Sequence, residues 1–176
     1  GPFFRDEARP DRSLLWFVLN AGKKGVTCNL EHPEGGDLLR RLVGQADVVL
    51  ESFPSGYLAR LGLDYEHFRE EHPKLVWVSV TGFGRDGPYA HYKWSDLVGL
   101  ALGGLLYLWG EQDRPPTRAR ASQAYYHASL GAALGGMLAL YHARRTGAGQ
   151  LVDVSMQEVV TFTLAGFNAV KREGVE

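Results

Sequence analysis

Short apolar runs that alternate with helical segments set the strongest limit on how this chain folds. Residues 47–53, 75–80 and 150–156 are runs of strand length, rich in Val and Leu. The segments between them, from Pro33 and from about Gln123, carry apolar residues at helical spacing. Strands separated by helices need crossover connections. The sequence therefore predicts an α/β fold, with a mostly parallel sheet and helices on both faces.

The remaining segments complete this alternation. Apolar segments at 14–19 and 25–30 flank a turn at 20–24, and Cys28 in the second segment is expected to be a buried strand residue rather than a nucleophile. Short helices are expected at 57–61 and 64–71, with Asp64 as an N-cap. A longer helix is expected at 96–108, and another after the last strand.

Composition excludes several classes of protein. A chain of 176 residues fits one domain, and its net charge of −1 creates no global attraction for nucleic acid or an anionic membrane. The single cysteine excludes an internal disulfide and a thiolate-rich zinc site. With an N-terminus that lacks the order of a signal peptide, this predicts a cytoplasmic protein.

Residues 121–143 carry no formal charge and are long enough to span a bilayer. The segment nevertheless holds eight polar or amphipathic side chains: Ser122, Gln123, Tyr125, Tyr126, His127, Ser129, Tyr141 and His142. We therefore expect a buried core helix and no membrane association.

A glycine motif follows the second predicted strand. Gly82, Gly84 and Gly87 match G-x-G-x-x-G, a pattern also found in dinucleotide-binding proteins. That site needs an apolar helix to begin at the last glycine, whereas no apolar stripe occurs here before Leu97. We expect instead a mobile loop at the carboxyl end of a strand.

Other catalytic and metal motifs are missing from the sequence. The six histidines do not form a metal-binding spacing, so no metal is predicted, and no G-x-S-x-G elbow occurs. Lys23, Lys24, Arg60 and Lys93 fall in turns or after strands, at the edge where open α/β sheets bind ligands. They are candidate phosphate ligands, and the alternative is that each is a solvated surface charge.

Several turns and strand ends together resemble the family III CoA-transferases, which include formyl-CoA transferase, carnitine CoA-transferase and the α-methylacyl-CoA racemases. The matching segments, in family order, are 20–26 (NAGKKGV), 29–30 (NL), 46–53 (ADVVLESF), 60–65 (RLGLDY), 72–76 (HPKLV), 81–84 (TGFG), 87–89 (GPY), 145–150 (RTGAGQ) and 153–155 (DVS).

The resemblance covers about residues 20–160 and implies a Rossmann-like sheet that is part of the family's large domain. It implies that residues 1–176 form a single partial large domain, without the family's first βαβ unit and its small second domain. Because the family forms interlocked dimers, a homodimer or a hetero-oligomer with a catalytic paralogue is expected.

The resemblance also implies a CoA-binding set and a CoA thioester with a carboxylic acid as substrates. Matched motif by motif, the family's CoA contacts fall on Asn20, Lys23, Ser52, Phe53, Arg60, Leu61 and Lys93. Lysine and arginine suit the phosphates, and Phe53 and Leu61 suit adenine or the pantetheine arm. Gly82, Gly84 and Gly87 would belong to an active-site loop.

The family's nucleophile is an aspartate whose carboxylate attacks the thioester and forms a mixed anhydride. Motif matching places it at Tyr125, or at Ala124 after a one-residue shift, and no Asp or Glu lies between Asp113 and Asp153. A phenol of ordinary pKa, about 10, is mostly neutral at pH 7. Tyr125 is therefore expected to be inactive, and to serve as a packing residue.

Three functions remain open from the sequence. The first is a CoA-transferase domain that binds CoA thioesters and needs a partner to supply the missing carboxylate. The second is a non-catalytic subunit that binds CoA esters or serves assembly. The third is an active transferase with an unrecognised nucleophile. Racemisation is disfavoured, because the family's His–Asp pair is replaced here by Ser95–Asp96 and the second Asp by Tyr125.

Overall fold

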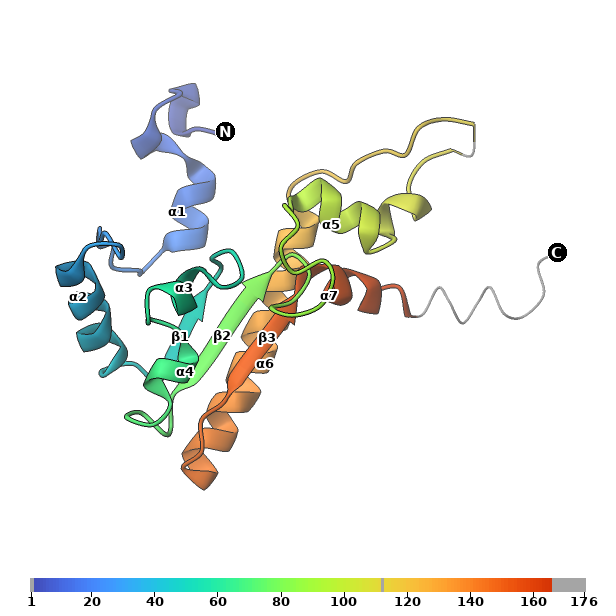
Figure 1. Cartoon of the computed structure of the whole chain (residues 1–176). Coiled ribbons are helices and arrows are strands. Elements are labelled where there is room, and N and C mark those ends of the chain that lie inside the picture. Colours follow the sequence, from blue (N-terminus) through green and yellow to red (C-terminus); the bar gives the residue numbers. More distant parts are fainter. Residues whose placement is uncertain (1, 112, 166–176) are drawn as a thin grey trace.

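The computed structural model describes residues 2–111 and 113–165, in which helices pack on a three-stranded sheet (Figure 1). The elements in chain order are η1 (Phe4–Asp6), η2 (Pro10–Arg12), α1 (Leu14–Asn20), α2 (Pro33–Val43), β1 (Val48–Glu51), α3 (Tyr57–Arg60), α4 (Tyr65–Phe68), β2 (Val76–Thr81), α5 (Asp96–Leu102), η3 (Leu105–Leu108), α6 (Gln123–Thr146), β3 (Leu151–Ser155) and α7 (Met156–Phe162).

The three strands form a parallel sheet in the order β1–β2–β3, which confirms the predicted sheet. Val48 of β1 pairs with Val76 of β2, and Trp77 of β2 pairs with Leu151 of β3. All three strands therefore end at the same edge of the sheet. Loops that leave this edge are in position to share a site.

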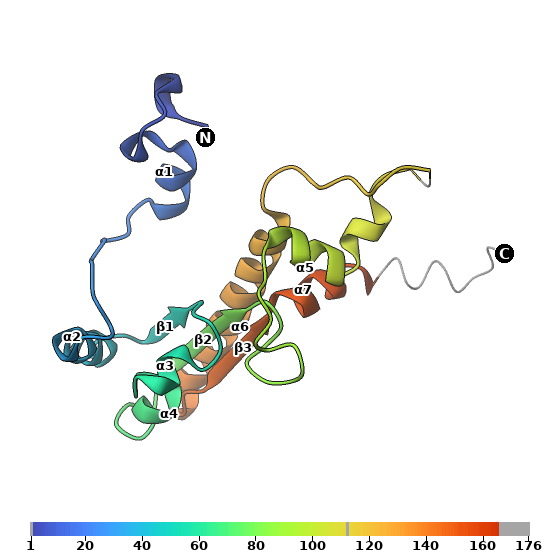
Figure 2. The same ribbon diagram turned by 45° about the horizontal axis from the view of Figure 1, so that its top comes forward.

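Strand β2 presents its two faces to two different helical layers. Trp77 packs with Leu58 of α3 and Phe68 of α4 on one face. On the other face, Val76 and Val78 pack with the alanines of α6. Figures 1 and 2 show α3 and α4 on one side of the sheet and α6 on the other, which confirms that helices cover both faces.

Helix α6 approaches the sheet closely because its inner face is made of small residues. These buried residues are Ala124, Ala128, Ala132, Gly136, Ala139 and Ala143. A Cβ atom at Gly135 would lie 2.9 Å from Val152, and one at Gly136 would lie 3.1 Å from Val78. The helix ends at Gly147, whose φ of 81° suits a left-handed cap.

The prediction of a fully buried helix at 121–143 is only half right. The outer face of α6 is apolar but exposed, and it carries Leu130, Leu134, Met137, Leu138 and Tyr141. Across residues 2–111 and 113–165, no helix has both the length and the apolarity needed to cross a membrane.

Two local predictions were wrong, and a third holds in position only. Residues 25–30 form no strand, and Cys28 is exposed, with its thiol donating to the carbonyl of Gly35 at 3.3 Å. The helix expected at 96–108 breaks at Gly103–Gly104, because Gly103 packs against Val160 and Gly104 has a φ of 86°. Asp64 is the N-cap residue of α4, as predicted, but its carboxylate makes no capping bond and contacts the side chains of His67 and Arg85 instead.

Candidate functional site

Two cavities lie at the carboxyl edge of the sheet and share Pro54 and Ser55 between them. The small cavity has a volume of about 20 Å³. It is lined by Glu51, Phe53, Pro54, Ser55, Gly56, Leu58, Ala59, Asp64, Trp77, Ser79 and Arg85. The loop cavity, about 490 Å³, is lined by Pro54, Ser55, Thr81, Ala90, His91, Tyr92, Lys93 and Trp94. Alternation along β2 puts Trp77, Ser79 and Thr81 on the same face of the sheet. Trp77 and Ser79 line the small cavity, and Thr81, at the end of the strand, lines the loop cavity.

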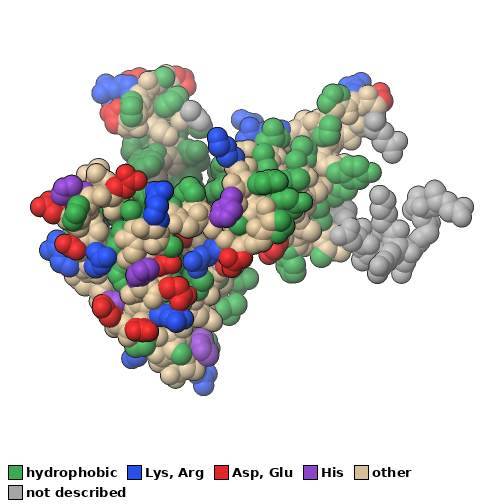
Figure 3. All heavy atoms as spheres, viewed as in Figure 1, with side chains coloured by type: hydrophobic (Ala, Val, Ile, Leu, Met, Phe, Trp, Pro, Cys, Tyr) green, Lys and Arg blue, Asp and Glu red, His purple; other side chains and the backbone are tan. Residues whose placement is uncertain are grey.

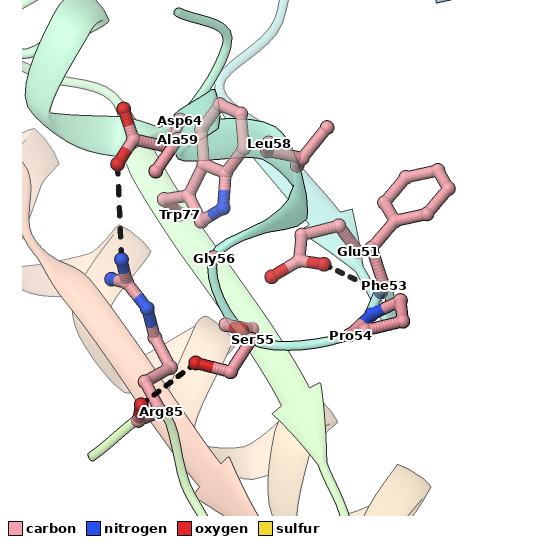
Figure 4. A pocket seen from close by; sticks show the side chains of 11 residues that line it. Glu51, Phe53, Pro54, Ser55, Gly56, Leu58, Ala59, Asp64, Trp77 and Arg85 are labelled. Carbon is pink, nitrogen blue, oxygen red and sulfur yellow. Dashed lines mark hydrogen bonds and ion pairs between the residues drawn. The ribbon is translucent and has the colours of Figure 1, made fainter. Parts of the chain in front are cut away.

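The small cavity is closed by contacts among its own residues (Figure 4). The hydroxyl of Ser55 donates to the carbonyl of Arg85 at 2.8 Å, and the Arg85 guanidinium lies 3.9 Å from the Asp64 carboxylate. The carboxylate of Glu51 accepts from the backbone N–H of Phe53 at 2.7 Å. Its volume suits a water molecule rather than a substrate.

The glycine motif lies where it was expected, in the loop after β2. The φ angles of Gly84 and Gly87 are 87° and 96°, values that favour glycine. A Cβ atom at Gly82 would lie 2.4 Å from the Cβ and Cγ atoms of Trp94, so this glycine lets Trp94 approach the backbone. The backbone N–H of Arg85 donates to the Asp153 carboxylate at 2.9 Å, which ties the loop to β3.

The loop cavity combines aromatic walls with a polar floor. Thr81 is 3% exposed, and its hydroxyl has no hydrogen-bond partner within the described part of the chain. Tyr92 and Trp94 supply rings, and Tyr92 packs against Tyr89 at a centroid distance of 5.1 Å. On the face shown in Figure 3, hydrophobic side chains gather over α5 and the segment before it, while charged side chains gather over α2–α4.

Tyr125, the position matched to the family's nucleophile, lies in the first turn of α6 beside this cavity. Its ring packs edge-on against Trp94, with centroids 5.8 Å apart and planes at 82°. The side chain is 40% exposed, so the packing role predicted for it is only partial.

Asp96 supports the site in a way that the sequence did not reveal. It is 5% exposed, and its carboxylate accepts from the backbone N–H of Ala124 at 2.9 Å and from the Arg118 guanidinium at 3.1 Å. The N-cap residue of α6, Ser122, makes no side-chain capping bond, so Asp96 caps this helix from another element. Asp96 thus fixes the backbone next to Tyr125.

The structure brings together four of the seven residues predicted to contact CoA. Ser52 and Phe53 directly follow β1, Arg60 is the last residue of α3, and Leu61 follows it. The rings of Phe53 and Tyr57 stack with their centroids 5.1 Å apart. The Arg60 guanidinium lies 5.4 Å from the centroid of the Tyr57 ring and 3.9 Å from the Glu31 carboxylate. Leu61 is partly buried against the core formed with Leu58 and Trp77, which leaves it less available than expected.

The other three predicted CoA contacts lie apart from this group. Lys93 lines the loop cavity, beyond Pro54 and Ser55. Asn20 ends α1, and the Lys23 ammonium donates to the carbonyl of Leu19 at 2.7 Å and to the Asn20 side chain at 3.2 Å. Figure 2 shows an extended segment between α1 and α2, and neither Asn20 nor Lys23 is among the residues that line the two cavities.

Comparisons with known proteins agree on one family. The model of CoA-transferase family III matches residues 2–172. Succinyl-CoA:(R)-benzylsuccinate CoA-transferase subunit BbsE of Thauera aromatica is 45% identical over 164 residues, which are 93% of this chain and 40% of that protein. The succinyl-CoA–L-malate CoA-transferase beta subunit of Chloroflexus aurantiacus is 36% identical over 87% of this chain and 38% of that protein.

Solved structures show the same likeness. A CAIB/BAIF family protein from Brucella suis superposes with a TM-score of 0.85 at 34% identity, covering 99% of this chain and 47% of that one. The chain thus spans less than half the length of the relatives and the structure that it matches.

The capping role of Asp96 predicts a loss of stability when its carboxylate is removed. Asp96→Ala leaves the buried N–H of Ala124 without an acceptor, and should lower the free energy of unfolding by about 1–3 kcal/mol. Asp96→Asn keeps an acceptor oxygen and should lose less. Denaturant unfolding measures both, with Asp113→Ala, an exposed acid, as a control expected to change by under about 0.5 kcal/mol. Equal stability of Asp96→Ala and the parent chain would contradict the role.

Proposed function

The chain belongs to CoA-transferase family III, and we propose that it binds CoA thioesters as part of an enzyme that transfers CoA between an acyl-CoA and a carboxylic acid. The observation that carries this is that Phe53 lines the small cavity and Lys93 lines the loop cavity, and that the two cavities share Pro54 and Ser55 at the carboxyl edge of the sheet. Ligands of open α/β sheets bind at this edge.

The spacing of these residues supports a path for the CoA molecule. Arg60, 69% exposed beside the Phe53–Tyr57 pair, suits the nucleotide end, where a guanidinium meets phosphate and a ring meets adenine. Pro54 and Ser55 lead from there to the loop cavity. The thioester end would then lie near Lys93 and Trp94, next to Tyr125.

The same geometry argues against turnover by this chain alone. The transfer needs a free carboxylate, and position 125 carries a phenol. Asp96, whose carboxylate contacts Ala124 next to Tyr125, is buried and accepts two hydrogen bonds. A carboxylate held in this way caps a helix and is not free to attack a thioester.

Of the two expected partners, a second copy in a homodimer and a catalytic paralogue in a hetero-oligomer, only the second can supply the nucleophile, because a second copy also carries Tyr125. We therefore assign the nucleophile to a catalytic paralogue. Two relatives support the second arrangement, because their names describe them as subunits of succinyl-CoA-dependent transferases. The substrates proposed on this basis are a succinyl-CoA-type thioester and a free carboxylic acid. The alternative, favoured by Tyr125 itself, is a subunit that binds CoA esters and takes no part in turnover.

Removal of the two charged side chains along the proposed CoA path, Arg60 at the nucleotide end and Lys93 near the thioester end, should weaken CoA binding. Arg60→Ala and Lys93→Ala should each raise the calorimetric Kd for CoA by about tenfold, since a hydrogen bond to a charged group contributes about 1.5 kcal/mol or more. Arg69→Ala is the matched control, because Arg69 is an exposed arginine paired with Glu66. If neither variant binds CoA more weakly than this control, the assigned path is wrong.

Transfer should appear only when a carboxylate is supplied. Mixed with a family member that carries the aspartate, this chain should exchange CoA between succinyl-CoA and a free acid faster than that partner does alone. The control is the same partner with its aspartate changed to asparagine, which should abolish exchange. Exchange by this chain without any partner would refute the assignment.

A further inference from the structure

We propose that the loop cavity selects carboxylic acids that carry a ring, with Tyr92 holding the ring and Thr81 donating to the carboxylate. The inference rests on the proposed function, and it goes further by naming the class of acid. Its basis is the lining of the cavity: one buried donor, aromatic walls and no acidic side chain.

The hydroxyl of Thr81 is the first observation that points to a ligand. It lies at the carboxyl end of the central strand, has less than 1 Å² of accessible surface, and has no partner within the described part of the chain. A buried hydroxyl without a hydrogen bond costs about 1–3 kcal/mol, so such groups are uncommon outside binding sites. An oxygen atom of a bound acid would satisfy it.

The walls of the cavity are the second observation. Tyr92 and Trp94 present rings and Pro54 and Ala90 present aliphatic surface, while Lys93 supplies a positive charge. The volume of about 490 Å³ falls within the range of about 300–1,000 Å³ common for small-molecule sites. It exceeds what a short acid without a side group would fill.

The position of the cavity assigns it to the acid rather than to adenine. Trp94 forms one wall and also packs edge-on against Tyr125, where the family places its nucleophile. A carboxylate supplied by a partner has to reach the same place to complete this site, and the reacting carbonyl has to lie next to it. The ring walls therefore surround the acyl group or the incoming acid, while the Phe53–Tyr57 stack is left for the nucleotide.

Calorimetry with three small probes on the full chain tests the proposal. The Kd for 3-phenylpropionate should be at least about tenfold lower than that for propionate, which lacks the ring, since burial of a ring adds aromatic contact area. The amine 3-phenylpropylamine has the ring but the opposite charge, and should not bind. CoA is titrated separately on the same protein.

Two variants locate the contacts. Tyr92→Ala should remove most of the preference for 3-phenylpropionate. Tyr141→Ala is the control and should keep this preference, because Tyr141 lies in the far part of α6 and is 61% exposed, close to the 58% of Tyr92. Thr81→Val should weaken both acids severalfold yet leave the melting temperature unchanged or higher, because it removes an unpaired buried hydroxyl.

A merely structural Thr81 would give no such combination. Equal affinity for the two acids, or unchanged binding in both variants, overturns the inference even if CoA binds. Selective acid binding in a chain that fails to bind CoA supports the inference and refutes the proposed function.

Discussion

The two faces of strand β2 carry two different requirements. Val76 and Val78 lie against the alanine face of α6, and a larger residue on that face would separate helix and sheet. On the opposite face, Trp77 packs in the core with Leu58 and Phe68. Ser79 and Thr81, further along the same face, line the two cavities. Because β2 pairs with a strand on each side, a change in its register would move the side chains on both of its faces at once. The close packing of α6 thus holds the site residues at the sheet edge.

The start of α6 is fixed by a second contact, made through the Asp96 carboxylate. This carboxylate caps the helix at Ala124 and also holds Arg118 of the preceding segment. Trp94, two residues before Asp96, fits against Gly82 on one side and Tyr125 on the other. One short segment therefore links the glycine loop, the aromatic wall of the loop cavity and the first turn of α6. The placement of Tyr125, at the position matched to the family's nucleophile, depends on this segment.

Much of the fold was predictable because it depends on the spacing of apolar residues that are close together in the sequence. The apolar run at 75–80 corresponds to β2, and the helix of small residues predicted from Gln123 corresponds to α6. The parallel sheet was predicted because helices separate the strands along the chain. What failed depends on distant contacts. Gly103 meets Val160, and Asp96 caps a helix whose bonded N–H lies 28 residues away. The loop cavity is assembled from residues 54–55, 81 and 90–94, so no single motif could show it, and the apolar segment containing Cys28 has no strand beside it.

The site therefore combines a place for a CoA thioester with a phenol where the family's chemistry needs a carboxylate. The most direct test is to find which chain carries the covalent intermediate. This chain and an aspartate-bearing partner are incubated with succinyl-CoA and treated with hydroxylamine, which converts an activated carboxylate to a hydroxamate that peptide mass spectrometry can locate. The account predicts the hydroxamate on the partner's aspartate and no modified residue in this chain. A hydroxamate on an acid of this chain, or an acyl group on Tyr125, would contradict it.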